Sequence, residues 1–140
     1  MIAAVVGAVF VALGAWHFVM AVSPPHRESA AIPHVNGRPL FVPSAAATAG
    51  VGMGLILCAL LGVSTAGVIA VGVPPRLLTR LSDVLALGLF VRAVGDFRYV
   101  GVFKSIHGSR FAAMDTWLYS PMCLALSVAV EYVAMHRMPS

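Results

Sequence analysis

Charged residues are scarce in this 140-residue chain, where Lys, Arg, Asp and Glu together make up 10% of the sequence. A soluble domain has about 25% charged residues. Here 60% of the residues are hydrophobic and the mean hydropathy is +0.94. The composition excludes an ordinary soluble domain and predicts an integral membrane protein. A chain of this length holds about four spans with short connections and no separate soluble domain.

The motifs of several enzyme classes are also absent. The two cysteines, Cys58 and Cys123, lie in different apolar segments without a CxxC pair, which argues against a thiol oxidoreductase and predicts buried free thiols. Neither HxxxH nor CxxC occurs, so we expect no metal site and no cofactor. A phosphate-binding glycine loop and a dinucleotide fingerprint are missing too. No named reaction follows, and whether the protein is an enzyme stays open.

The net charge of +4 does not indicate a nucleic-acid partner, because the basic residues are scattered rather than gathered in a stripe. They lie in loops and at span ends, as the positive-inside pattern predicts for a membrane protein. The basic residues of the two longer connections slightly outnumber those on the other side. This difference weakly favours cytoplasmic long loops and leaves the orientation open.

Four apolar runs predict an all-α fold, a four-helix transmembrane bundle that forms one integral membrane domain over residues 1–140. The expected spans are roughly residues 2–22, 44–73, 77–100 and 115–136. The first run has no Lys or Arg before it, so we interpret it as a retained span rather than a signal peptide. The long loop 23–43 and the loop 101–114 then lie on one side of the membrane. We expect a multi-pass protein of the cell membrane, surrounded by membrane lipids, in the bacterial inner membrane.

The second run contains Gly50 and Gly54 at GxxxG spacing. Small residues at this spacing let helices approach closely in lipid. The pair predicts either close packing inside the bundle or a homo-oligomer formed through this face.

The segment from Val91 to Pro121 carries six of the fourteen charged residues of the chain, although its surroundings are apolar. A charge within hydrocarbon costs about 2.5–3.5 kcal/mol on insertion scales, so such residues are usually paired or functional. We therefore predict a polar pocket where the two long loops meet the bundle. Its candidate residues are His17, Arg38, Arg92, Asp96, Arg98, Tyr99, Lys104, Asp115 and Tyr119.

Two strings in the chain are specific for their length, Gly95–Gly101 (GDFRYVG) and Asp115–Pro121 (DTWLYSP). They occur together with His17 after Trp16, the loop element Gly37–Pro43 (GRPLFVP), Arg92–Val94, Phe103–Lys104 and Phe111. In combination they resemble the family of small bacterial membrane proteins known as domain of unknown function 3995, over nearly the whole chain. The resemblance implies the four-span topology and the candidate residues chosen above, and it implies no activity.

The candidate residues support more than one hypothesis. In the first, they bind a lipid-like or other amphiphilic small molecule, with its charged head at Arg and Lys and its apolar tail between helices. In the second, they only hold the helices together, with Arg92 paired to Asp96 and with Arg98 or Lys104 paired to Asp115 in a structural or accessory subunit. Acid–base chemistry at His17 with Asp96 or Asp115 is a variant of the first hypothesis.

A third hypothesis is a proton-coupled small exporter that uses Glu131 as its intramembrane carboxylate. Four short spans and a weak charge bias fit that class. Such a site belongs near the middle of the first span, where the sequence offers only His17.

Overall fold

The computed structural model describes residues 1–23, 32–35, 38–95 and 98–136. Helices dominate it, and the strands are two residues long. In chain order the elements are α1 Ile2–Val22, β1 His34–Val35, β2 Arg38–Pro39, α2 Ala45–Thr65, α3 Pro75–Val94, α4 Arg110–Met114, the π-helical turn η1 Asp115–Tyr119 and α5 Ser120–Met135. The predicted all-α fold is confirmed.

Three helical segments are long and apolar enough to cross a membrane. They are α1, α2 and the continuous stretch Arg110–Met135, which comprises α4, η1 and α5. Helix α3 has 20 residues, which span about 30 Å. It carries Arg76, Arg80, Asp83 and Arg92, so it is less apolar than the other three.

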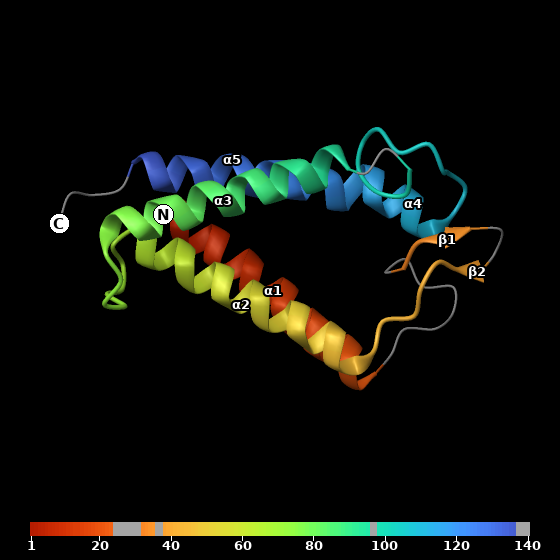
Figure 1. Ribbon diagram of the computed structural model, residues 1–140, viewed down its shortest axis with the longest axis horizontal. Helices are drawn as coiled ribbons and strands as arrows, with labels where there is room; N and C mark the ends of the chain where they lie inside the picture. The colour runs from red at the N-terminus through yellow and green to blue at the C-terminus, as the bar shows by residue number, and fades with distance from the viewer. Residues whose placement is uncertain (24–31, 36–37, 96–97, 137–140) are drawn as a thin grey trace.

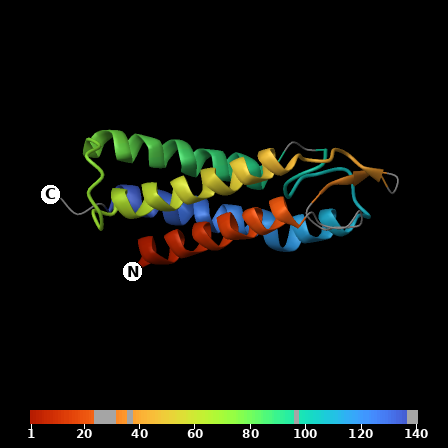
Figure 2. The same ribbon diagram turned by 90° about the horizontal axis from the view of Figure 1, so that it is seen from below.

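The four long segments form two antiparallel pairs. Helix α1 packs along α2, and α3 packs along α5, while contacts between the pairs are fewer (Figures 1 and 2). The pairs meet near the start of α1 and the end of α5, and they diverge toward the end that holds β1, β2 and α4 (Figure 1). The beginning of α1 and the end of α5 thus lie at one end of the molecule, and the two longer connections lie at the other.

The core lies where the two pairs meet, and each long helix contributes to it. It contains Val6, Phe10, Ala59, Ala86, Leu126 and Val130. Phe10 is 1% exposed and is the largest of the fully buried side chains in the described part of the chain. Buried polar residues lie toward both ends, with Ser64, Thr65 and Ser82 where the pairs meet and with Lys104, Asp115 and Ser120 toward the diverging end.

Close contact between α1 and α2 depends on Gly14 and Gly52 rather than on the GxxxG pair of the second run. A Cβ on Gly14 would lie 2.9 Å from the Gly52 carbonyl oxygen, and a Cβ on Gly52 would lie 3.0 Å from that of Gly14. A Cβ on Gly50 or Gly54 would meet nothing within 4 Å. The GxxxG pair therefore does not pack inside the bundle but lies on the outer face of α2. Its alternative role, pairing of two copies, stays a prediction.

The second helix ends at Thr65 rather than at residue 73, and the local hydrogen bonds explain this correction. Gly67 adopts a left-handed conformation with φ of +76°, its N–H donates to the Ser64 carbonyl, and the N–H of Val68 donates to that of Val63. This is a Schellman ending, which glycine favours because it has no Cβ. The apolar residues that follow form a turn before Pro75 begins α3 at its first helical position.

The third helix is also shorter than the predicted span 77–100, since it begins at Pro75 and ends at Val94 with Gly95 as its cap. The last helical stretch starts earlier than predicted, at Arg110 rather than at residue 115. Ser109 caps it, because its hydroxyl accepts from the N–H of Ala112 at 3.0 Å. Just before Pro121 this stretch widens into the π-helical turn η1.

Candidate functional site

The carboxylate of Asp115 is the centre of a buried charged cluster at the diverging end. It is fully buried, and Arg92 on α3 donates to its Oδ1 through Nη2 at 2.7 Å. Its Oδ2 accepts from the backbone N–H of Gly101 at 2.7 Å and from Lys104 Nζ at 3.2 Å. We call Arg92, Lys104 and Asp115 the Asp115 cluster. It connects α3, the following loop and η1.

Lys104 has no hydrogen-bonding capacity to spare. Its side chain is fully buried, and besides Asp115 it donates to the Gly101 carbonyl at 3.1 Å and to Thr116 Oγ1 at 2.6 Å. An ammonium group has three N–H donors, and all three have acceptors here. Thr116 in turn donates to the Ala112 carbonyl at 3.1 Å. Lys104 is therefore closed to a ligand in this conformation.

Two glycines, Gly95 and Gly101, come close together and form a neck in the loop after α3, three residues before Lys104. Gly95 and Gly101 have φ values of +91° and +94°. A Cβ on Gly95 would collide with the Val100 carbonyl, and one on Gly101 would collide with the carbonyl of Val94. The N–H of Val102 donates to the Ala93 carbonyl at 3.0 Å, which holds the two sides of the neck together. Only glycine fits both positions, and this close approach aims the Gly101 N–H at Asp115.

The π-helical turn η1 places Asp115 and Ser120 in the interior together. Both are 0% exposed although they are five residues apart, a spacing that would turn them to different sides of a regular α-helix. In η1 the Ser120 N–H donates to the Asp115 carbonyl, so one wide turn returns to the same side. Pro121 follows directly and has no N–H for a regular ladder.

His17 belongs to a different part of the same end. It lines an apolar pocket of about 350 Å³, which we call the His17 pocket. The remaining lining residues are Met20, Ala21, Ile32, Phe41, Val42, Pro43, Ala45, Ala47, Thr48 and Val51. None of them belongs to the Asp115 cluster. The structure thus places the predicted residues in two neighbourhoods instead of one pocket.

The imidazole of His17 is oriented by its own helix. Its Nδ1 lies 2.8 Å from the Leu13 carbonyl oxygen, which can only accept. Nδ1 therefore carries a proton, and Nε2 of the neutral ring is an acceptor with no partner in the described part of the chain. Thr48 is the second polar group of the pocket, and its hydroxyl donates to the Ser44 carbonyl at 3.1 Å.

The other candidate residues lie around these two neighbourhoods. Arg38 is exposed on β2, and the guanidinium of Arg98 lies 5.3 Å from the ring centroid of Tyr99 in the exposed loop. Tyr119 is half-buried in η1, with its ring centroid 6.0 Å from that of Phe111. Asp96 lies outside the described residues.

The pairing of charges differs in part from the structural hypothesis. Lys104 does pair with Asp115, but Arg92 pairs with the same carboxylate. Sequence reasoning missed Gly101, Thr116 and Ser120. Backbone donors leave no mark in a sequence, and a Thr or Ser in an apolar run resembles any small residue. The one signal available in the sequence was the pair of glycines, Gly95 and Gly101, at the neck of the loop after α3.

Glu131 lies one turn before the end of α5. It lines a groove between α3 and α5 that also contains Asp83. A position this close to the end of a helix does not suit the mid-span carboxylate of a proton-coupled exporter. In the described part of the chain no three His, Cys, Asp or Glu residues are grouped as a metal site would require.

A comparison with protein families covers the strings that contain the Asp115 cluster. The family model described as "Protein of unknown function (DUF3995)" matches residues 5–130, which takes in every long helix and both neighbourhoods. The chain belongs to the DUF3995 family. This confirms the resemblance found in the sequence. No curated protein and no solved structure matches this DUF3995 chain.

Proposed function

We propose that this DUF3995 protein is a multi-pass protein of the cell membrane that binds an amphiphilic small molecule at the diverging end of its helix pairs. The apolar part of the ligand occupies the His17 pocket. The observation that carries this proposal is a mostly apolar pocket with one oriented imidazole in its wall. Small-molecule sites have this composition, and their volumes begin at about 300 Å³.

The location of the pocket supports a ligand from the membrane. Its walls come from the end of α1, the start of α2 and the connection between them. Phe41 and Val42 of that connection are 53% and 79% exposed, which places apolar surface beside the opening. An acyl or isoprenoid chain reaches such an opening from the bilayer without passing through water. His17 Nε2 then accepts from a hydroxyl or a protonated acid on the ligand.

The experiment is native mass spectrometry of the protein released gently from detergent. We expect a reproducible extra mass on the wild type. Val51→Trp fills the pocket from α2 and should remove that mass. Leu57→Trp is the matched control, because Leu57 is exposed on the same helix and does not line the pocket.

A bare wild-type mass, or a bound mass that survives Val51→Trp, would contradict ligand binding in this pocket. That result favours the second function, a structural or accessory membrane subunit. One observation supports this alternative on its own: the carboxylate of Asp115 and the ammonium of Lys104 are fully buried and bonded within the chain. A group saturated in this way holds helices together and leaves nothing for a substrate.

A further inference from the structure

The Asp115 cluster carries more positive than negative charge. Two cations, Arg92 and Lys104, share the single carboxylate of Asp115. Lys104 and Asp115 are fully buried, whereas the Arg92 side chain is 36% exposed. An uncompensated cation in an apolar environment is strongly unfavourable. The cluster as described therefore lacks one negative charge.

Arg92 is the member of the cluster with free donors. Within the described residues only its Nη2 is paired, and Nη1 is buried without an acceptor. The Arg92 side chain is 36% exposed, whereas those of Lys104 and Asp115 are 0% exposed. The guanidinium thus stands between the closed part of the cluster and the space outside it. Any counter-ion for the cluster has to approach Arg92.

A second buried donor lies on the same side of η1. Ser120 is 0% exposed, and its hydroxyl has no hydrogen-bond partner in the part of the chain that the structure describes. A buried hydroxyl without a partner is rare and needs a structural reason. It lies one wide helical turn beyond Asp115, so the cluster and the turn beside it hold two unpaired donors, Arg92 Nη1 and the Ser120 hydroxyl. Both can donate, and both lack an oxygen acceptor.

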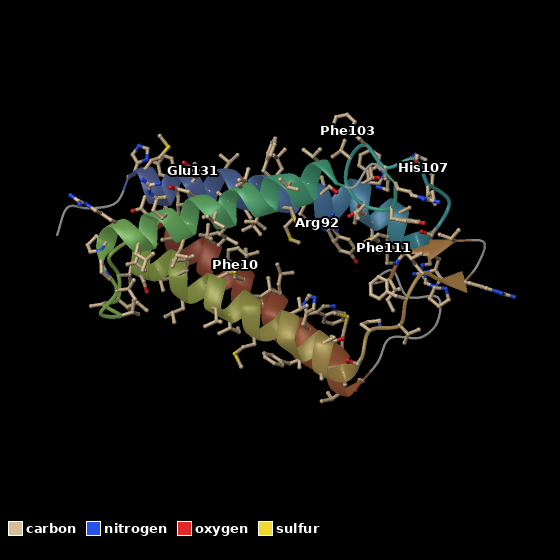
Figure 3. All side chains as sticks on the ribbon, viewed as in Figure 1. Phe10, Arg92, Phe103, His107, Phe111 and Glu131 are labelled. Carbon is tan, nitrogen blue, oxygen red and sulfur yellow. The ribbon has the colours of Figure 1, made fainter. Side chains whose placement is uncertain are left out.

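Figure 3 shows where Arg92 lies. Arg92 is on the side of the α3–α5 pair that faces the α1–α2 pair, while Phe103 lies on the opposite, outer side. The two pairs diverge toward this end.

We infer that Arg92 binds the anionic headgroup of an amphiphile, a phosphate or a carboxylate, on the side of the α3–α5 pair that faces the α1–α2 pair. The planar guanidinium fork matches both anions with paired N–H···O bonds. A headgroup oxygen supplies the missing negative charge and the missing acceptor. This inference specifies the ligand class of the proposed function and rests on it for the apolar tail, whereas the anion site itself rests on Arg92 alone.

The test uses the full chain in nanodiscs of phosphatidylcholine with and without phosphatidylglycerol, followed by native mass spectrometry. We expect phosphatidylglycerol to be retained in preference to phosphatidylcholine. Arg92→Gln should weaken that retention by about tenfold or more, because it removes the partner of a charged hydrogen bond. Arg92→Lys keeps the charge and should retain part of the binding. Arg80→Gln removes an exposed Arg from the same helix and should change nothing.

Two further arms identify the source of the anion. A long-chain fatty acid tests the carboxylate, and inorganic phosphate tests a free anion without a tail. If inorganic phosphate binds as tightly as the lipid, the anion site stands and the lipid is excluded as its source. Equal retention of the two phospholipids, or wild-type retention in Arg92→Gln with the protein folded, would overturn the inference.

The outcome is separable from that of the proposed function. If Val51→Trp removes the bound mass and Arg92→Gln does not, the His17 pocket binds a ligand without an anionic headgroup at Arg92. If Arg92→Gln weakens phosphatidylglycerol binding and Val51→Trp leaves it unchanged, the anion site holds and the pocket assignment fails.

Asp96→Asn is the internal control. If Asp96→Asn and Asp115→Asn destabilise the fold equally and no lipid is retained, the chain neutralises its own cluster.

Discussion

The Asp115 carboxylate accepts a 2.7 Å hydrogen bond from the backbone N–H of Gly101, fourteen residues earlier in the chain. This bond fastens the neck of the loop after α3 to the turn that begins the last long helix. It depends on a backbone conformation that only glycine adopts easily, because φ at Gly101 is +94°. A charge in the membrane region and a glycine in a loop therefore act as one structural unit.

The first prediction concerns that glycine. Gly101→Ala should destabilise the fold, because its Cβ would collide with the Val94 carbonyl and move the N–H away from Asp115. Backbone strain alone costs about 1–3 kcal/mol. Thermal unfolding in detergent measures the loss. Gly108→Ala is the control, since Gly108 also has a φ of +94° but nothing within 4 Å of its Cβ. Equal losses of stability in the two variants would mean that the collision at the neck adds nothing to the cost of the positive φ angle.

The second prediction concerns the central charge. Asp115→Asn leaves Lys104 buried without a counter-ion, and breaking a buried pair costs about 3–5 kcal/mol. The protein should lose most of its thermal stability or fail to accumulate. Asp83→Asn is the control, because Asp83 is only half-buried and takes part in no ion pair within the described residues. If the Asp115→Asn protein is as stable as the wild type, the Asp115 cluster has no structural role.

The sequence was sufficient to predict the main architecture. Apolar runs separated by prolines and polar connections give four helices, because in a membrane the backbone must satisfy its hydrogen bonds internally. It also singled out Arg92, Lys104 and Asp115, since charges in an apolar setting need a partner. It did not predict where α2 ends, because residues 66–73 are as apolar as a span and only the left-handed conformation of Gly67 ends the helix.

The arrangement of the site was beyond the sequence for a different reason. Helical spacing suggested that Arg92 pairs with Asp96, which lies outside the described residues. Within them, the long guanidinium of Arg92 reaches Asp115 on the last helical stretch. Asp115 attracts two cations and a backbone N–H because the loop neck and η1 bring them together. Such contacts are far apart in the chain, and no spacing encodes them. The same holds for His17, which lies in a separate neighbourhood although it belongs to the same end.

A third prediction distinguishes the glycines of α2. Gly52→Leu should separate α1 from α2 and destabilise the protein, because even a Cβ at this position meets the Gly14 carbonyl at 3.0 Å. The loss should reach about 1–3 kcal/mol or more, as for other overpacked interiors. Gly54→Leu should leave the fold intact, since no atom lies within 4 Å of its Cβ. Thermal unfolding compares the two variants, and similar losses would contradict the packing described for α1 and α2.

The outer face of α2 permits a fourth prediction about oligomers. Gly50 and Gly54 are exposed on it, so a second copy can approach closely there. If two copies pair through this face, replacing both glycines with Leu should convert a dimer into a monomer while each chain stays folded. Light scattering coupled to size-exclusion chromatography in detergent measures the mass. A dimer that persists in the double variant would place the contact elsewhere, and a monomeric wild type would exclude it.

The fifth prediction tests whether Lys104 is as fully committed as its contacts indicate. Thr116→Val keeps the shape of the side chain but removes the oxygen that accepts from Lys104 Nζ at 2.6 Å. A buried N–H of a charged group then has no acceptor, which should cost about 1.5–3 kcal/mol of stability. Thr79→Val is the control, because the Thr79 hydroxyl bonds only to the Pro75 carbonyl of its own helix, at an exposed site. Lipid retention should not change in Thr116→Val, since Arg92 and not Lys104 has the free donors. If stability stays constant while lipid retention falls, Lys104 releases Thr116 to meet the ligand, and the structural role assigned to Lys104 is wrong.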